Sequence, residues 1–391
     1  MHRPLAHMIV FLGIVLLVVG GSHYLLWTRL VRSTDLQAPW RIFATSAIVG
    51  LGLSLPLGLI ASRLIDAQWT RAMAAVSFTW LGLLFLLLMG LGISELLQFG
   101  HRLQAGLPDP DRRVFLARLL GGGAAAAALL AGAGALRSAL RSPELLHVTV
   151  KLQRLPSKFH GLSIVQVSDL HVGPTIRKED VQDLVERINA LKPDIVALTG
   201  DLVDGPVSML RGQIAPFADV KSTYGTFLVT GNHEYYSGVD EWLAEWRKLG
   251  VKPLRNERVT IGHGEHSFEL AGVDDWTAHN FGGDHGHDMA KALQGHDPKR
   301  EIVLLAHQPK SIVEAAKLGV GLQLSGHTHG GQIWPFHWLV KMVQPYVAGL
   351  DKHGDTWIYV SRGTGYWGPP MRLAAPSELT RIVLHAQAVP A

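Results

Sequence analysis

The stretch Gly326-His327-Thr328-His329-Gly330-Gly331 carries two histidines separated by a single residue. In an extended chain, side chains two residues apart point to the same face. The flanking glycines allow the backbone to turn sharply and to pack close to what the histidines hold. This pattern predicts a metal site.

Four other stretches carry matching ligand types, and each follows a short apolar run that predicts a buried strand. They are Asp169 and His171 after 163–167, Asp201 after 195–198, Asn232 with His233 and Glu234 after 227–229, and His307 after 302–305. Because each motif lies at the end of a strand, we expect all five to meet at one edge of a sheet.

Composition points to a chain of two different parts. The 391 residues are 48% hydrophobic, which suits two or more domains. Residues 1–144 hold 12 Arg, no Lys and 6 acidic residues, whereas residues 145–391 hold 24 basic and 26 acidic residues. The positive charge flanks apolar runs, so no nucleic-acid partner is expected. The absence of cysteine excludes disulfides, thiolate catalysis and Cys-ligated zinc.

Residues 1–144 are interpreted as a transmembrane region, an all-α bundle of about four helices. Its apolar runs are long enough to cross a hydrocarbon core and cover 7–27, 42–62, 73–97 and 115–136. The last run is rich in Ala and Gly, and the alternative for it is a buried soluble helix or linker. Glu95 is the single acidic residue inside these runs, so we expect an anchor and not a transporter.

The arginines favour one orientation of this bundle. The loops after the first and third helices hold six arginines against five on the opposite side, which places those loops in the cytoplasm. Arg112 and Arg113 precede a small-residue stretch and resemble a twin-arginine export signal, which would face the same way. The alternative is that this pair anchors a helix end at the headgroups. We expect a multi-pass protein of the cell membrane whose residues 145–391 lie outside the cytoplasm.

Residues 145–391 have the pattern of an α/β domain. Residues 147–152 alternate as an edge strand does, and 178–191 have helical periodicity. Strands and helices continue to alternate over 195–198, 227–229, 239–249, 267–273, 302–305, 311–318, 357–361 and 379–384. We expect two packed sheets flanked by helices.

The ordered motif set resembles the calcineurin-like metallophosphoesterase family over roughly the last 240 residues. The matching motifs are Asp169-x-His171, Gly200-Asp201-x-x-Asp204, Gly231-Asn232-His233-Glu234, His307 and Gly326-His327-x-His329. The resemblance implies a four-layer α/β/β/α sandwich after the transmembrane bundle.

The resemblance also implies two divalent metal ions, for which the donor set suits Mn, Fe or Zn. One ion would take Asp169, His171, Asp201 and His329, and the other would take Asp201, Asn232, His307 and His327. Asp201 would bridge the two. His233 would be the acid or electrostatic partner of the leaving group, and Asp204 would orient a histidine.

We therefore expect a membrane-anchored enzyme, a hydrolase that cleaves a phosphomonoester or phosphodiester by metal-activated hydroxide. Its substrate could be lipid or envelope-derived. One alternative is a pyrophosphatase acting on a nucleotide-linked lipid such as UDP-diacylglucosamine. The other is a catalytically silent membrane scaffold, whose mark would be loss of ligands; none of the expected ligands is missing.

Two further stretches allow more than one interpretation. His279, His285 and His287 lie in an irregular glycine-containing loop, which is interpreted as solvated, with a third metal site as the alternative. The run 362–367 (Arg-Gly-Thr-Gly-Tyr-Trp) could shape a substrate rim or simply form a turn after a strand.

Overall fold

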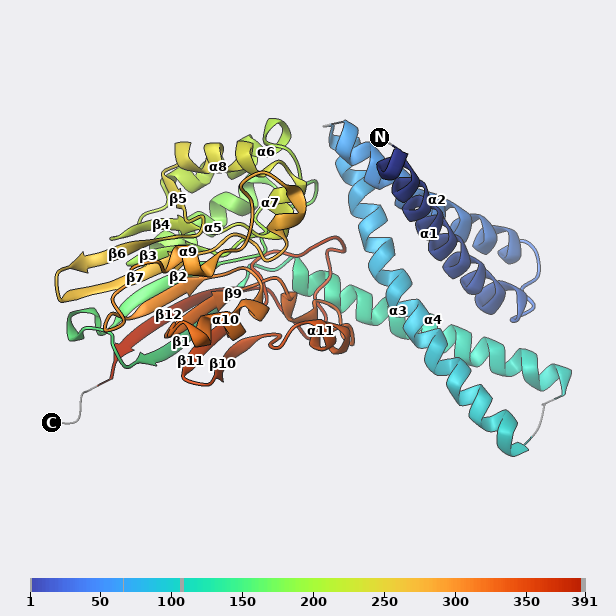
Figure 1. Ribbon diagram of the computed structural model, residues 1–391. Helices are drawn as coiled ribbons and strands as arrows, with labels where there is room; N and C mark the ends of the chain where they lie inside the picture. Colours follow the sequence, from blue (N-terminus) through green and yellow to red (C-terminus); the bar gives the residue numbers. More distant parts are fainter. Residues whose placement is uncertain (1, 66, 106–108, 388–391) are drawn as a thin grey trace. The chain divides into compact units, whose positions relative to one another are not determined.

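The computed structural model describes residues 2–65, 67–105 and 109–387 (Figure 1). Within these ranges, side chains are described for 13–62, 65, 67–100 and 109–387. The predicted span 7–27 therefore begins with residues 7–12, whose side chains lie outside the described ones. The chain divides into two compact units, Met1–Arg137 and Ser138–Ala391.

The first unit contains long apolar helices. They are α1 His2–Trp27, α2 Trp40–Leu64, α3 Gln68–Ala105 and α4 Pro110–Ala139, with a π-helical turn, η1, at Thr28–Arg32. Among the described residues, four helices are long and apolar enough to cross a membrane. A helix suits such sequences because it satisfies its backbone hydrogen bonds internally where no water is present. The Ala- and Gly-rich run 115–136 lies inside α4, which is one of these four.

Polar side chains inside the helical unit have partners. Glu95 forms an ion pair with Arg29, at 3.0 Å. His23 accepts a hydrogen bond at Nε2 from Trp80 Nε1, at 2.9 Å. The Ser77 hydroxyl donates to the Ser54 carbonyl at 2.7 Å, bridging α3 and α2. Such pairing is required of polar groups that lie away from water, and it is compatible with an anchor.

The second unit contains two six-stranded sheets. In the first, the strand order is β1 Glu144–Leu152, β12 Glu378–Ala386, β2 Leu162–Val167, β3 Ile195–Leu198, β4 Gly225–Leu228 and β5 Val251–Pro253. In the second, it is β10 Gly349–His353, β11 Thr356–Val360, β9 Leu322–Ser325, β8 Ile302–Leu305, β7 His266–Gly272 and β6 Glu257–His263. β2, β3, β4 and β5 run parallel, and so do β7, β8, β9 and β11. Each sheet therefore collects several carboxyl ends at one edge.

The register aligns these ends. Val167 pairs with Leu198, and Leu198 with Leu228, so β2, β3 and β4 finish level with one another. In the second sheet, Leu305 at the end of β8 pairs with Leu324 in β9. In each sheet, the loops that follow these strands therefore begin at strand ends that lie level with one another.

Helices cover the outer face of each sheet. On the first sheet they are α5 Lys178–Ala190, α6 Val207–Ile214 and α8 Val239–Lys248, and on the second they are α9 Met289–Ala292 and α10 Ile312–Lys317. Two further short helices, α7 Asn232–Tyr236 and α11 His337–Val343, lie in the connections after β4 and β9. Short 3₁₀ helices occur at Ser157–Phe159, Ala215–Asp219, Ala278–Phe281, Pro309–Ser311 and His329–Gly331.

Three hydrophobic clusters define the layers of this unit. One joins the inner faces of the two sheets, one joins the first sheet to α5, α6 and α8, and one joins the second sheet to α9 and α10. Successive side chains of a strand point to opposite faces of the sheet, so one strand contributes to two clusters. In β2, Ile164 belongs to the cluster between the sheets, while Val165 belongs to the cluster between the first sheet and its helices. The four-layer α/β/β/α arrangement is confirmed.

The predicted strands at 195–198 and 302–305 coincide with β3 and β8, which are buried on both faces and therefore continuously apolar. β9, which leads into the histidine motif, was not predicted. It contains Gln323, which is fully buried and donates to the Ser325 hydroxyl at 2.9 Å. Buried strands are predicted from continuous apolar runs, and a polar residue inside a four-residue strand interrupts such a run.

Candidate metal centre

The predicted ligands leave the ends of five strands, but these strands belong to two sheets. Asp169, Asp201 and Asn232 follow β2, β3 and β4 of the first sheet, while His307 and His327 follow β8 and β9 of the second. The expectation that one sheet edge carries all the motifs is therefore wrong. The sandwich brings two edges together, and two of the three groups of candidate ligands draw on both, while His171, Asp204 and His233 all follow strands of the first sheet.

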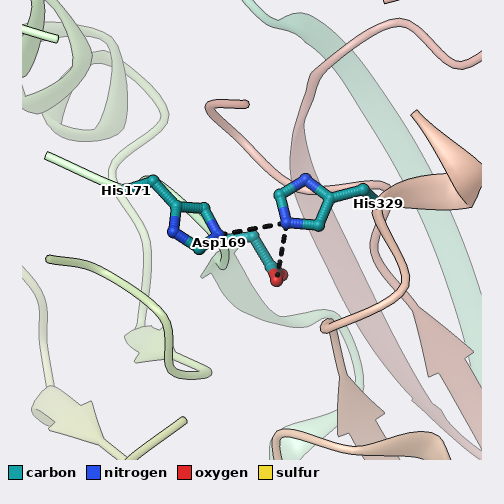
Figure 2. A group of neighbouring side chains, drawn as sticks. All are labelled: Asp169, His171 and His329. Carbon is teal, nitrogen blue, oxygen red and sulfur yellow. Dashed lines mark hydrogen bonds and ion pairs between the residues drawn. The ribbon is translucent and has the colours of Figure 1, made fainter. Parts of the chain in front are cut away.

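The first cluster contains Asp169, His171 and His329, whose candidate ligand atoms lie within 4.8 Å of one another. Nε2 of His171 is 3.1 Å from Nε2 of His329, and the latter is 3.4 Å from Oδ1 of Asp169 (Figure 2). All three residues are buried. Two imidazole nitrogens facing each other beside a buried carboxylate suit a cation.

The second cluster contains Asp201, His307 and His327. Nε2 of His307 is 3.0 Å from Oδ2 of Asp201 and 3.2 Å from Nδ1 of His327. Nδ1 of His307 donates to the Thr199 carbonyl at 2.8 Å. This hydrogen bond fixes the ring so that Nε2 faces the cluster, as second-layer contacts do for histidine ligands.

His327 and His329 lie in different clusters, because the chain between them is not extended. Their φ angles are 70° and 51°, and Thr328 between them is helical at φ −83° and ψ −19°. The argument that both side chains point to one face of an extended chain is therefore wrong. The turn separates the two imidazoles and presents one to each cluster.

Asn232 offers a test of whether a metal fits. Its Oδ1 is buried and has no hydrogen-bond partner. Buried polar atoms in proteins are nearly always paired, so this oxygen fits a ligand. Carboxylate, amide and imidazole donors together suit Mn, Fe or Zn.

Five of the seven predicted ligands have left-handed backbone conformations, which non-glycine residues rarely adopt. They are Asp169, His171, Asp201, His327 and His329, with φ between 51° and 70°. Such strain persists only where the surrounding fold enforces it, and it gathers at functional sites. Gly326 shows how tight the packing is, because a Cβ there would lie 2.1 Å from Oδ2 of Asp169.

The charges of the metal-free centre are unequal. Burial alone would raise the pKa of Asp201, but the charges of His307 and His233 hold it well below the usual value. Burial opposes protonation of His307, yet Asp201 raises the pKa of His307 well above normal. Burial lowers the pKa of His329 strongly, with help from Arg372. A cation would therefore compete with a proton more strongly at His307 than at His329.

Asp204 contacts two histidines. Its Oδ1 accepts from Nδ1 of His171 at 3.0 Å and from Nδ1 of His233 at 2.6 Å. Burial lowers the pKa of His233, but Asp201 and Asp204 outweigh it and raise this pKa to about 9. In the metal-free protein, His233 is therefore protonated at neutral pH.

Aromatic side chains line the exposed side of His233. The ring centroids of Tyr236 and Trp367 lie 5.3 Å and 5.7 Å from that of His233. Trp367, the last residue of the run 362–367, is thus at the rim of the centre. Arg362, the first residue of the run, instead donates to Glu378 at 2.6 Å.

Sequence reasoning assigned no role to two buried charged residues. Glu234 accepts the backbone N–H groups of Gly231, Asp201 and Leu202 at 2.7 to 2.9 Å, and so holds two motif loops together. The position of Glu234 in the 231–234 motif is the feature of the sequence that could have predicted this role. Arg372 is fully buried and donates to the carbonyl of His329 at 2.9 Å. Nothing local distinguishes this arginine, since the contact spans 43 residues.

The histidine loop has other contacts. His285 lies 2.9 Å from Arg255, His287 lies 3.0 Å from Glu314, and Nδ1 of His279 lies 3.2 Å from the Trp276 carbonyl. None of the three belongs to a cluster of candidate ligands among the described residues.

Carboxylate and imidazole clusters at the carboxyl ends of parallel strands in two mixed sheets suit a metal-dependent hydrolase. A family model described as calcineurin-like phosphoesterase matches residues 162–331. A Danio rerio protein named transmembrane protein with metallophosphoesterase domain is 34% identical over 395 residues, covering 94% of this chain and 87% of the relative. The chain belongs to the calcineurin-like metallophosphoesterase family, and it is a membrane protein.

A Bos taurus protein of the same name is 42% identical over 263 residues, covering 64% of this chain but 59% of that protein. The chain thus spans less than two thirds of this relative. Among solved structures, a dimetal phosphatase from Danio rerio is similar with a TM-score of 0.39 and 11% identity, covering 58% of this chain and 93% of that one.

Proposed function

We propose that this protein is a membrane-anchored phosphoesterase that uses two divalent metal ions to hydrolyse a phosphomonoester or a phosphodiester. The observation that carries the proposal is the pair of ligand clusters, together with the unpartnered buried Oδ1 of Asn232. Two clusters are needed for two ions, and Asn232 would complete one of them.

One ion would be held by Asp169, His171, Asp201 and His329, and the other by Asp201, Asn232, His307 and His327. The contacts of Asp201 support its role as the shared ligand. Its side chain meets His307, and its backbone carbonyl accepts the N–H of His171 at 3.1 Å. Its carboxylate would therefore lie close enough to both clusters to be shared between the ions.

When bound, the ions would neutralise phosphoryl oxygens and make hydroxide available near neutral pH. The remaining chemistry belongs to the protein. Asp204 engages Nδ1 of His233, which leaves Nε2 as the nitrogen able to give a proton to the leaving oxygen. The same carboxylate oxygen holds Nδ1 of His171, which directs Nε2 of that residue into the first cluster.

The substrate class and the side of the membrane are part of the proposal. A membrane-tethered centre meets phosphoesters at the bilayer surface, which favours lipid or envelope substrates. If all four candidate helices span the membrane, both ends of the helical unit would lie on one side. The arginine balance favours the outside for the second unit.

The full chain in detergent, stripped of metal and reloaded separately with Mn²⁺, Zn²⁺ or Fe²⁺, provides the test. We expect hydrolysis of p-nitrophenyl phosphate or bis(p-nitrophenyl) phosphate only after reloading. Undiminished hydrolysis by the stripped protein would contradict the metal requirement. Loss of both activities in a protein that retains two ions would contradict the reaction class. His266→Ala, which changes an exposed histidine in β7, is the control.

A further inference from the structure

An exposed apolar surface follows the metal loop along the chain. We define the α11 patch as Trp334, Trp338, Leu339, Met342 and Val343, all of which are exposed. Met342 is 80% exposed and Val343 72%. The helix α11 buries none of its residues. Contiguous apolar surfaces of this kind mark binding sites in soluble units.

The patch borders the metal centre. Gly331 has φ 83°, and a Cβ there would lie 2.5 Å from Cα of His337, so the start of α11 packs directly on the metal loop. Gln332 donates to the carbonyl of Trp367 at 2.8 Å and accepts the N–H of Trp367 at 2.9 Å. The Trp367 ring in turn contacts His233. The patch and the exposed side of the centre therefore share one region of the surface.

The composition of the patch suits a bilayer surface. From residue 332 to residue 350 the chain has no acidic residue and a single lysine, Lys341. The Nζ of Lys341 lies 5.0 Å from the ring of Trp338. Tryptophan and lysine are the residues that favour the membrane interface, with the ring among the headgroups and the ammonium toward anionic phosphates.

The membrane-spanning helices belong to the same chain as the α11 patch. The span α4 ends at Ala139 and β1 begins at Glu144, so four residues connect them. A connector of this length reaches at most about 14 Å. The second unit is thus tethered by a short connector to the last candidate span, and such a tether raises the effective concentration of a bilayer surface for a weakly binding apolar face.

We propose that the α11 patch inserts into the interface of the bilayer that holds the helical unit. Docking there would open the metal centre toward the membrane surface. A lipid phosphoester could then enter with its acyl chains still in the bilayer. The entry of a lipid phosphoester rests on the proposed function, whereas the docking of the α11 patch does not.

The absence of cysteine makes a direct test possible. Met342→Cys and Val313→Cys each give one attachment point for a nitroxide; Val313 is the control, because it is 45% exposed on α10. The full chain is placed in nanodiscs of phosphatidylethanolamine and phosphatidylglycerol. We expect the label at 342 to collide readily with oxygen and poorly with a water-soluble nickel complex. The label at 313 should show the opposite.

Equal nickel accessibility at the two positions would overturn the docking. Dipolar broadening between labels at 342 of two copies would also overturn it, in favour of contact between protein molecules.

Activity tests the consequence for substrates. The double variant Trp338→Glu, Met342→Glu should hydrolyse a phosphatidic acid probe in vesicles about tenfold more slowly, because insertion is lost. Its activity on p-nitrophenyl phosphate should be unchanged. Equal loss on both substrates, or on neither, would overturn the lipid consequence. Failure of the unsubstituted protein on every phosphoester would overturn the proposed function, while the nitroxide result would still decide the docking.

Discussion

Oδ1 of Asp204 lies 2.6 Å from Nδ1 of His233, and the same oxygen accepts from Nδ1 of His171. One carboxylate thus orients both a candidate metal ligand and the candidate proton donor. Metal affinity and turnover should be coupled through it.

Asp204→Asn should test this coupling, because the amide keeps the shape but loses the charge. We expect metal affinity to fall about 10- to 100-fold, the usual range for a partner of a histidine ligand. Turnover should also fall at saturating metal. Metal titration and steady-state kinetics provide both readouts. Asp240→Asn, at an exposed carboxylate on α8, is the control. Unchanged metal affinity would show that Asp204 acts on His233 alone.

Asp201→Asn should weaken both metal sites, whereas His171→Ala should chiefly weaken one. The reason is that Asp201 is proposed as a ligand of both ions, whereas His171 would hold one of them. Metal content after equilibrium dialysis measures this difference. Retention of two full equivalents by Asp201→Asn would refute a shared ligand.

His233→Ala should keep its metal ions and lose turnover, since a group that acts on the transition state contributes little to ground-state binding. We expect a loss of about 10²- to 10⁴-fold for esters with poor leaving groups. Activated aryl esters should be affected less if His233 donates a proton. Wild-type rates on both kinds of ester would remove His233 from the mechanism.

The raised pKa of His233 predicts a pH dependence of stability for the metal-free chain. The folded value of about 9 exceeds the ordinary value of 6.5. Protonation therefore stabilises the fold fully below pH 6.5, and this contribution is lost as the pH rises through about 9. Its size is at most about 3 kcal/mol.

Thermal unfolding of metal-free protein between pH 6 and about 9.5 measures this loss. His233→Gln should flatten the decline in this window relative to the unsubstituted chain, with His266→Ala as control. An identical decline in His233→Gln would assign the pH dependence to other groups.

The proposed orientation predicts that a tag after Ala391 is digested by protease added to intact spheroplasts. If Arg112 and Arg113 form an export signal, their joint replacement by Lys should leave the tag protected. Protection of the unsubstituted protein, with digestion only after lysis, would reverse the orientation. Digestion in both proteins would keep the orientation and exclude the export route.

Local sequence was sufficient for features that depend on composition over a short window. The run 42–62 predicts a spanning helix because its length and apolarity alone meet the requirement of a bilayer. The strand at Ile195–Leu198 was predictable because burial on both faces demands a continuous apolar run. The ligand types at Asp169, His307 and His327 were also readable, because metal chemistry limits which side chains can serve.

The family resemblance implied how those residues are combined, and the tertiary structure shows the physical reason. His327 and His329 occupy different clusters because the turn between them is left-handed at both histidines. Such backbone strain is unfavourable locally and is held only by surrounding packing. Arg372 reaches His329 across 43 residues, and α11 is exposed beside the metal loop because Gly331 lets it approach. These contacts join residues that are far apart in the chain, and they form only when the two sheets and their connecting loops pack together. A short window of sequence therefore does not predict them.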